Sequence, residues 1–164
     1  MKPTTHRLMN SRWQALSGAL AGFAATIPMS VAMTRMYHQL PPAEQYPLPP
    51  NQIVGKVVEE DHEPAHQIVT FLGHFAYGSG AGAVYQLLLG RFPLPGVVKG
   101  LLFGLTVWFV SYQGWLPAFR ILPPATQQPP RRNILMIVAH VIWGGTLALL
   151  SGAILNTSKR EHKR

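Results

Sequence analysis

Four long stretches of the chain contain no charged side chain, and segments rich in proline and charge separate them. Lys, Arg, Asp and Glu are all absent from residues 13–34, 64–90, 100–119 and 133–158. A helix needs about 20 residues to cross the hydrocarbon core of a bilayer. The pattern therefore predicts an all-α protein, a four-span transmembrane helical bundle with helices at about 13–36, 66–90, 98–119 and 133–156.

Composition supports a single integral membrane domain over residues 1–164. Hydrophobic residues make up 48% of the chain and charged residues only 12%, against about 25% charged in an average soluble domain. A soluble fold would have to bury four helices that are apolar on all sides, and 164 residues leave too little chain to cover them. We therefore expect the lipid bilayer to be the main partner.

The distribution of basic residues predicts the topology. Lys and Arg gather near the N-terminus, between the second and third spans, and in the tail 157–164, whereas five of the six acidic residues lie in the Pro-rich loop 37–65. An excess of Lys and Arg marks the cytoplasmic side. Both termini are thus expected in the cytoplasm and loop 37–65 outside. The net charge of +8 reflects this topology, and we expect no nucleic-acid partner.

The absence of cysteine excludes disulfides and thiolate chemistry.

The second half of the chain resembles the first. Residues of the first span recur in the third at an offset of 82, and residues of the second recur in the fourth at an offset of 66: Gly18 and Gly22 match Gly100 and Gly104, while His74, Tyr77 and Gly78 match His140, Trp143 and Gly144. We expect a tandem-duplicated helical hairpin with parallel repeats related by a pseudo-twofold axis along the membrane normal. Chance similarity between glycine-rich helices is the alternative.

Small residues four apart occur in every span. The pairs are Gly18 with Gly22, Gly78 with Gly82, Gly100 with Gly104, and Gly144 with Ala148. Such spacing allows helix backbones to approach closely in membranes. These faces exceed the obvious needs of one bundle, so we also expect a homo-oligomer.

The segment His62-Glu63-Pro64-Ala65-His66 fits the HExxH pattern of zinc proteases. That chemistry requires both imidazoles on one helical face with the glutamate as base. Pro64 favours a helix that begins at this point and leaves His62 before it. We expect no protease activity and no enzymatic activity of any other kind. A weak metal site using His62, His66 and Glu59 and a solvated helix start are the alternatives.

His74 and His140 occupy equivalent places in the second and fourth spans. Each lies roughly 10 Å deep, given a rise of about 1.5 Å per residue. The pair could hold haem b or a metal ion, since intramembrane histidines are costly and often functional. The favoured interpretation is that each ring hydrogen-bonds a neighbouring helix, with no cofactor, because no acidic residue lies within any span.

A polar set near the helix ends could line a solute path: Gln86, Ser111, Tyr112 and Gln113. We expect these residues instead to lie at the membrane interface, where water satisfies them. Four helices leave little room for a pore, so transport would require an oligomer.

Several short segments resemble the YagU-like group of uncharacterised bacterial inner-membrane proteins: GALAGFAATIPM, YPLPPNQI, GHFAYG and AHVIWG. The resemblance implies an inner-membrane location and attaches no activity to any residue. The sequence thus predicts a non-enzymatic structural or accessory membrane component. A haem- or metal-binding electron-transfer subunit using His74 and His140, and a small oligomeric transporter, are the alternatives.

Overall fold

The computed structural model describes residues 11–56, 63–90 and 92–161. Those residues form helices, turns and loops, with no strand among them. The all-α class predicted from the sequence is confirmed.

Long helical stretches correspond to each charge-free segment. They are α1 (Ser11–Tyr37), α3 (Glu63–Leu89) and α6 (Pro130–Glu161), together with a stretch in which α4 (Gly96–Phe109), the π-helical segment η2 (Val110–Trp115) and α5 (Leu116–Ala118) follow one another directly. Shorter elements lie in the connections: η1 (Pro42–Glu44), α2 (Pro49–Val54) and η3 (Ala125–Gln127).

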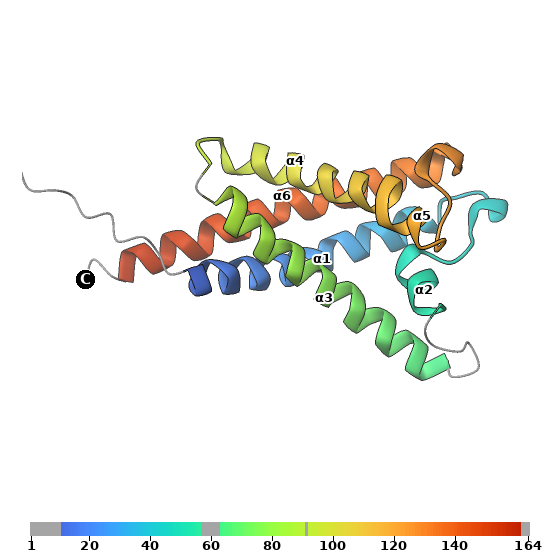
Figure 1. Ribbon diagram of the computed structural model, residues 1–164, viewed down its shortest axis with the longest axis horizontal. Coiled ribbons are helices and arrows are strands. Elements are labelled where there is room, and N and C mark those ends of the chain that lie inside the picture. The colour runs from blue at the N-terminus through green and yellow to red at the C-terminus, as the bar shows by residue number, and fades with distance from the viewer. Residues whose placement is uncertain (1–10, 57–62, 91, 162–164) are drawn as a thin grey trace, which may run out of the picture.

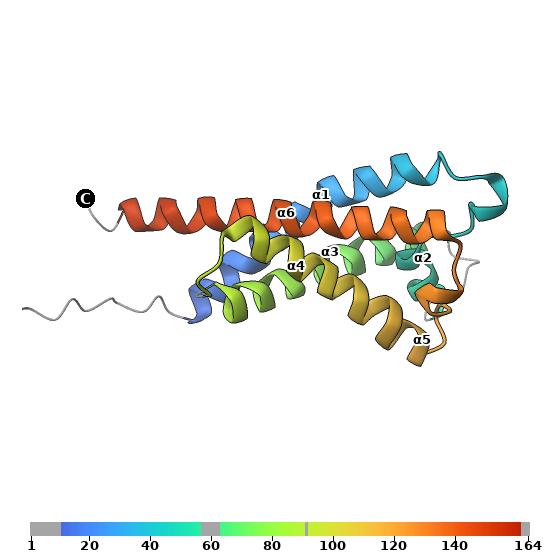
Figure 2. The same cartoon turned by 90° about the horizontal axis from the view of Figure 1, so that it is seen from above.

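The long helices pack as two hairpins. The first hairpin is α1 with α3, and the second is α6 with the stretch α4–η2–α5. Helix α1 also packs along α6, whereas α3 and α4 have few contacts with each other. The start of α1, the end of α6 and the α3–α4 turn lie at one end of the bundle, which we call the terminal end (Figures 1 and 2). The short elements α2 and α5 lie at the opposite end, the loop end.

Glycines bring the helices of the first hairpin into backbone contact. A Cβ added at Gly82 would lie less than 3.0 Å from the Cα of Gly22, and one added at Gly18 would lie equally close to the carbonyl oxygen of Gly82. Real Cβ atoms do not approach other atoms so closely. Only glycine therefore permits this crossing of α1 and α3.

The second hairpin uses the equivalent glycines of its first helix. Added Cβ atoms at Gly100 and Gly104 would meet the carbonyl oxygens of Gly144 and His140 respectively. The Cβ at Gly100 would also meet the side chain of Ala148, which matches Gly82 at the sequence offset, so the backbone contact lies one helical turn earlier on α6 than the offset predicts. The small-residue faces that motivated an oligomer are thus largely used within one chain, whereas Cβ atoms at Gly80 and Gly152 would meet open space.

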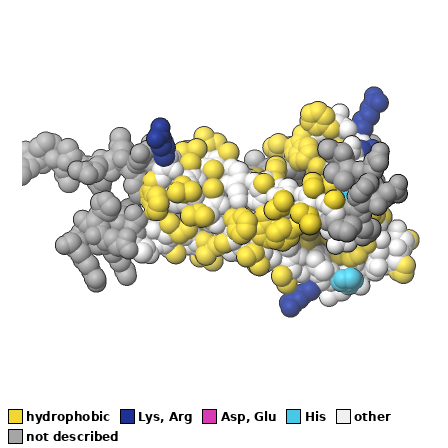
Figure 3. Space-filling view, turned by 90° about the horizontal axis from the view of Figure 1, so that it is seen from below, with side chains coloured by type: hydrophobic (Ala, Val, Ile, Leu, Met, Phe, Trp, Pro, Cys, Tyr) yellow, Lys and Arg dark blue, Asp and Glu magenta, His cyan; other side chains and the backbone are white. Residues whose placement is uncertain are grey.

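The outer surface of the bundle is strongly apolar. Two helices, α1 and the part of α6 from Pro130 to Thr157, are long and apolar enough to cross a membrane. Exposed large hydrophobic side chains also lie on α3 and α4, for example Phe71 and Leu102. In the space-filling view hydrophobic side chains cover the middle of the molecule, and Lys and Arg stand at its edges (Figure 3). Contiguous exposed apolar surface of this kind indicates association with a membrane.

Candidate functional site

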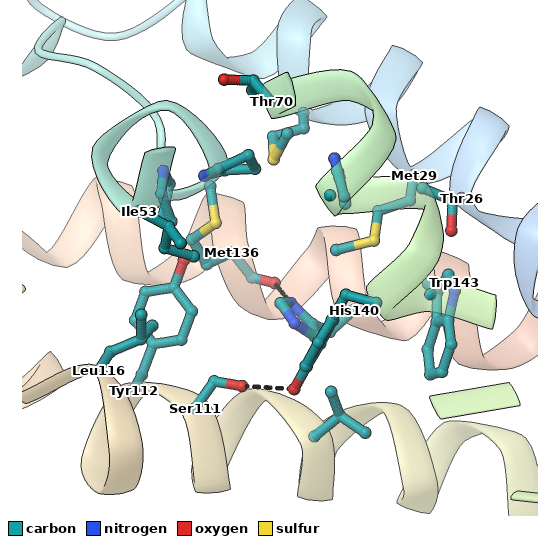
Figure 4. Close-up of a pocket in the computed structure, with 18 of the residues that line it drawn as sticks. Thr26, Met29, Ile53, Thr70, Ser111, Tyr112, Leu116, Met136, His140 and Trp143 are labelled. Carbon is teal, nitrogen blue, oxygen red and sulfur yellow. Dashed lines mark hydrogen bonds between the residues drawn. The ribbon is translucent and has the colours of Figure 1, made fainter. Parts of the chain in front are cut away.

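A cavity of about 220 Å³ lies toward the loop end of the bundle, where both hairpins and α2 meet (Figure 4). Its lining is mainly apolar, with a few polar side chains. The principal lining residues are Thr26, Met29 and Met33 from α1, Pro50 and Ile53 from α2, Thr70, Gly73, His74 and Tyr77 from α3, Ser111, Tyr112 and Trp115 from η2, and Met136, His140 and Trp143 from α6. None of these residues is Lys, Arg, Asp or Glu.

His140 presents one ring nitrogen to this cavity. The side chain is only 7% exposed, and its Nδ1 lies 2.8 Å from the carbonyl oxygen of Met136, one turn earlier in α6. A carbonyl only accepts hydrogen bonds, so Nδ1 carries a proton and Nε2 of the neutral ring is an acceptor. Among the described residues Nε2 has no hydrogen-bond partner. An acceptor nitrogen is therefore available to a molecule in the cavity.

His74 lines the same cavity from α3, so the structure brings together the two histidines that the sequence singled out. Its ring is half-buried, and no described residue hydrogen-bonds to it. This arrangement differs from the expected pair of interhelical hydrogen bonds, because His140 bonds its own helix. The carbonyl four residues earlier on the same helix lies within reach of a ring nitrogen, so this bond competes with any bond to a neighbouring helix.

The matched aromatics Tyr77 and Trp143 each connect the two hairpins. Trp143 Nε1 donates a hydrogen bond to the carbonyl oxygen of Gly22 at 3.3 Å, and the hydroxyls of Tyr77 and Ser111 lie 3.2 Å apart. Trp115 Nε1 also donates to Ser111 Oγ at 3.2 Å. The bonds of Tyr77 and Trp143 thus join walls of the cavity that are distant in sequence, and the Trp115 bond lies within η2.

The expectation that water satisfies the polar set at the helix ends is wrong for three of its four members. Ser111 and Tyr112 are 4% and 3% exposed and line the cavity. Both lie in η2, where the α-helix widens into a π-helix, a distortion that is often found at functional sites. Gln86 is also buried, beside Gly18 near the terminal end.

Three buried methionines of the cavity were missed by the sequence analysis. Met29 and Met33 lie one turn apart on α1, and Met136 lies one turn before His140 on α6. Their spacing was a signal that could have found them, because residues four apart share a helical face. The same spacing is typical of methionines in an ordinary helix core, so only the packing of the helices shows that these side chains line a cavity.

The HExxH segment does not form a site in the part of the chain that is described. His62 lies outside the described residues, and α3 begins at Glu63, so that Pro64 falls in its first turn. His66 is half-buried near Gly55. Within residues 11–56, 63–90 and 92–161 no group of three or more His, Cys, Asp or Glu side chains is placed to hold a metal ion.

A second hollow adjoins the cavity, between α1, α2 and α3. We call it the lateral groove. Ile27 and Phe71 lie in its walls and belong to the exposed apolar surface, so the groove opens where a bilayer would contact the protein. The groove and the cavity share Met33, Pro50, Thr70 and His74.

The helical fold, the apolar exterior and the internal cavity define a class, that of helical membrane-associated proteins with a binding-sized cavity between their helices. The chain belongs to the family described as "protein of unknown function (DUF1440)", whose family model matches residues 50–149. The predicted resemblance to an uncharacterised family is confirmed at that level. The match includes α3 and both histidines. Comparison with curated proteins and with solved structures gives no match.

Proposed function

We propose that this protein is a non-enzymatic, four-span protein of the bacterial inner membrane, related to the YagU-like group, that binds a small, mainly apolar molecule in its cavity. The observation that carries the proposal is the unpartnered Nε2 of buried His140 in an otherwise apolar cavity built by both hairpins. A few polar groups in an apolar concave site are typical of small-molecule binding.

Four spans are supported by length and by the outer surface. Helix α3 has 27 residues, and α4, η2 and α5, with 14, 6 and 3 residues, form one uninterrupted helical stretch. Both reach about 30 Å or more at 1.5 Å per residue. Both also carry exposed apolar side chains. With four spans the basic segments near the termini and the α3–α4 turn share one side, which is the cytoplasmic side.

A tandem duplication is supported by the two glycine crossings. Gly18 and Gly22 in the first hairpin and Gly100 and Gly104 in the second each lie against the backbone of the helix that completes the hairpin. The hairpins meet asymmetrically, because α1 packs along α6 whereas α4 has few contacts with α3. In this proposal the asymmetry arose after duplication and left room for the cavity.

A ligand explains the cavity better than packing does. Protein interiors are close-packed, and residual voids destabilise by about 24 cal/mol per Å³. The methionine side chains in the lining are flexible and polarisable, and they adapt to the shape of a bound molecule. Occupancy would restore the missing contacts and provide a partner for His140.

A metal-binding protein is the second candidate function. Two imidazoles and the thioethers of Met29, Met33 and Met136 line one cavity, and such soft ligands suit Cu(I). Haem b held by His74 and His140 is the other form of this candidate. Oligomerisation and solute transport stay predictions.

The proposal can be tested by extracting the protein from membranes with its bound molecules. Gly73 borders the cavity, and a side chain there would enter open space; Gly80, on the same helix, is equally open but borders neither hollow. We expect wild type and the control Gly80→Phe to retain about one small organic molecule per chain, and Gly73→Phe to lose it, by mass spectrometry of solvent extracts. Equal content in all three proteins, or stoichiometric copper or haem instead, would overturn the proposal.

A further inference from the structure

We infer that the bound molecule is a membrane isoprenoid quinone, whose ring enters the cavity sideways between α1 and α3 and whose tail lies in the lateral groove. The inference rests on the proposed function, since it names the class of ligand for the same cavity. It is carried by the connection between the two hollows and by the polar groups at their junction.

The junction is a natural entrance from the bilayer. Helices α1 and α3 are in backbone contact where Gly22 meets Gly78, and they separate toward the loop end, with α2 beyond them (Figure 1). The lateral groove occupies this separation and shares Thr70 and His74 with the cavity. A molecule dissolved in the bilayer could therefore reach His74 without crossing water.

Two buried hydroxyls along this path lack the usual partner. Thr26 and Ser79 each donate a hydrogen bond to the carbonyl four residues earlier, at 2.9 Å, which is how hydroxyls in apolar helices are normally satisfied. Ser30 and Thr70 make no such bond, and no described residue partners either oxygen. Ser30 lines the groove, and Thr70 lines both hollows. Leaving a buried hydroxyl unpaired costs free energy, so a ligand that engages it gains affinity.

The polar groups of the cavity match a quinone ring in both of its redox states. The two carbonyl oxygens of a quinone can accept hydrogen bonds from Thr70, His74 and Tyr112, which all line the cavity. The Thr70 hydroxyl is buried without a partner, and the Tyr112 hydroxyl makes no hydrogen bond to a described residue. His140 Nε2 can accept from a quinol hydroxyl. Met29 from α1 and Trp143 from α6, two helices that pack side by side, would give the ring apolar contacts.

Size and charge argue against other membrane constituents. An apolar cavity of about 150 Å³ is large enough to bind benzene. The cavity of this protein, at about 220 Å³, is large enough for a substituted ring. No Lys, Arg, Asp or Glu is in the described lining, so a charged phospholipid head would be left uncompensated. A plain hydrocarbon chain would leave the hydroxyls of Thr70 and Tyr112 unpaired.

Binding can be followed by quenching of tryptophan fluorescence with decylubiquinone, because Trp115 and Trp143 lie in the cavity wall. We expect saturable quenching of the purified protein in lipid nanodiscs for wild type and Gly80→Phe, and at least tenfold weaker binding for Gly73→Phe. Non-saturable quenching that is the same in all three proteins would overturn the inference.

A subtler pair of variants tests the hydrogen bond. Thr70→Val removes a hydroxyl that has no partner in the protein, so the fold should keep its stability, whereas affinity should fall about three- to tenfold. The matched control Thr106→Val removes a hydroxyl that bonds Leu102 on the exposed side of α4, and its affinity should equal that of wild type. Unchanged affinity in Thr70→Val would contradict the assignment of this hydroxyl to the ligand.

The tail is tested with the same quinone ring lacking its decyl chain. We expect binding at least tenfold weaker, because the groove would be empty; equal affinity would exclude the groove as the tail site. Retention of another organic molecule without saturable quinone binding would overturn this inference and leave the proposed function in place. Loss of both would overturn both.

Discussion

The guanidinium of Arg132 lies over the aromatic ring of Tyr46, with its central carbon 3.6 Å from the ring centroid. Arg132 is at the start of α6 and is 3% exposed. Its nitrogens also donate hydrogen bonds to the carbonyl oxygens of Glu44, Tyr46 and Pro47, at 2.8, 2.9 and 3.1 Å. One side chain of the second hairpin thus holds the connection between α1 and α2, just before α2 lines the cavity.

Replacing Arg132 by Lys should loosen this loop. Lysine keeps the charge but lacks the planar fork that reaches several carbonyls and stacks on a ring. Hydrogen bonds to charged groups contribute about 1.5–3 kcal/mol each, so we expect a clear loss of thermal stability and faster proteolysis within 38–56. Arg131→Lys is the control, because Arg131 is exposed. Equal proteolysis of the two variants would show that Arg132 does not anchor the loop.

Replacing Gly82 by Ile should destabilise the first hairpin. The new side chain would meet the backbone of Gly18 and Gly22, whereas Gly80→Ile places the same side chain in open space. Overpacking costs about 1–3 kcal/mol or more where backbones must separate. We expect a lower unfolding temperature in detergent for Gly82→Ile only. Wild-type stability of that variant would mean that α1 and α3 do not cross at these glycines.

The topology can be measured with single cysteines, since the chain has none of its own. Gln39, Leu94 and Gln127 are exposed positions in the three connections. Membrane-impermeant maleimide applied to intact cells should label cysteines at 39 and 127 but not at 94, because the basic segments favour the cytoplasm. Labelling at 39 and 94 together would show that α3 does not span, and labelling at 94 and 127 together would show the same for α4.

The two histidines should act as a unit in ligand retention. Because both line one cavity, His74→Ala and His140→Ala should each remove most of the bound organic molecule, and the double variant should lose little more. Two independent packing groups would instead give additive effects on stability with no change in bound material. The wild-type visible spectrum should show no Soret band; a haem spectrum that vanishes in both single variants would establish the second candidate function.

The sequence by itself determined the helical class and the positions of the long helices. Charge-free stretches of the required length are a local property, because each helix satisfies its own backbone hydrogen bonds. The glycine spacing and the equivalence of His74 and His140 could be read in the same way, since they depend only on positions along one helix. The end of α1, the start of α6 and the proline-rich connections followed from proline and charge.

Only the tertiary structure decided which residues line the cavity. Met29 and Met136 are 107 residues apart in the numbering, and nothing local distinguishes them from other core methionines until α1 and α6 pack together. Ser111 and Tyr112 were expected at the interface but are buried, because η2 faces the first hairpin, where the hydroxyls of Ser111 and Tyr77 lie 3.2 Å apart. The unpartnered state of Thr70 is likewise a relation between helices. A cavity is a property of the space between elements, and that space is set by the angle at which glycine-mediated crossings let helices separate.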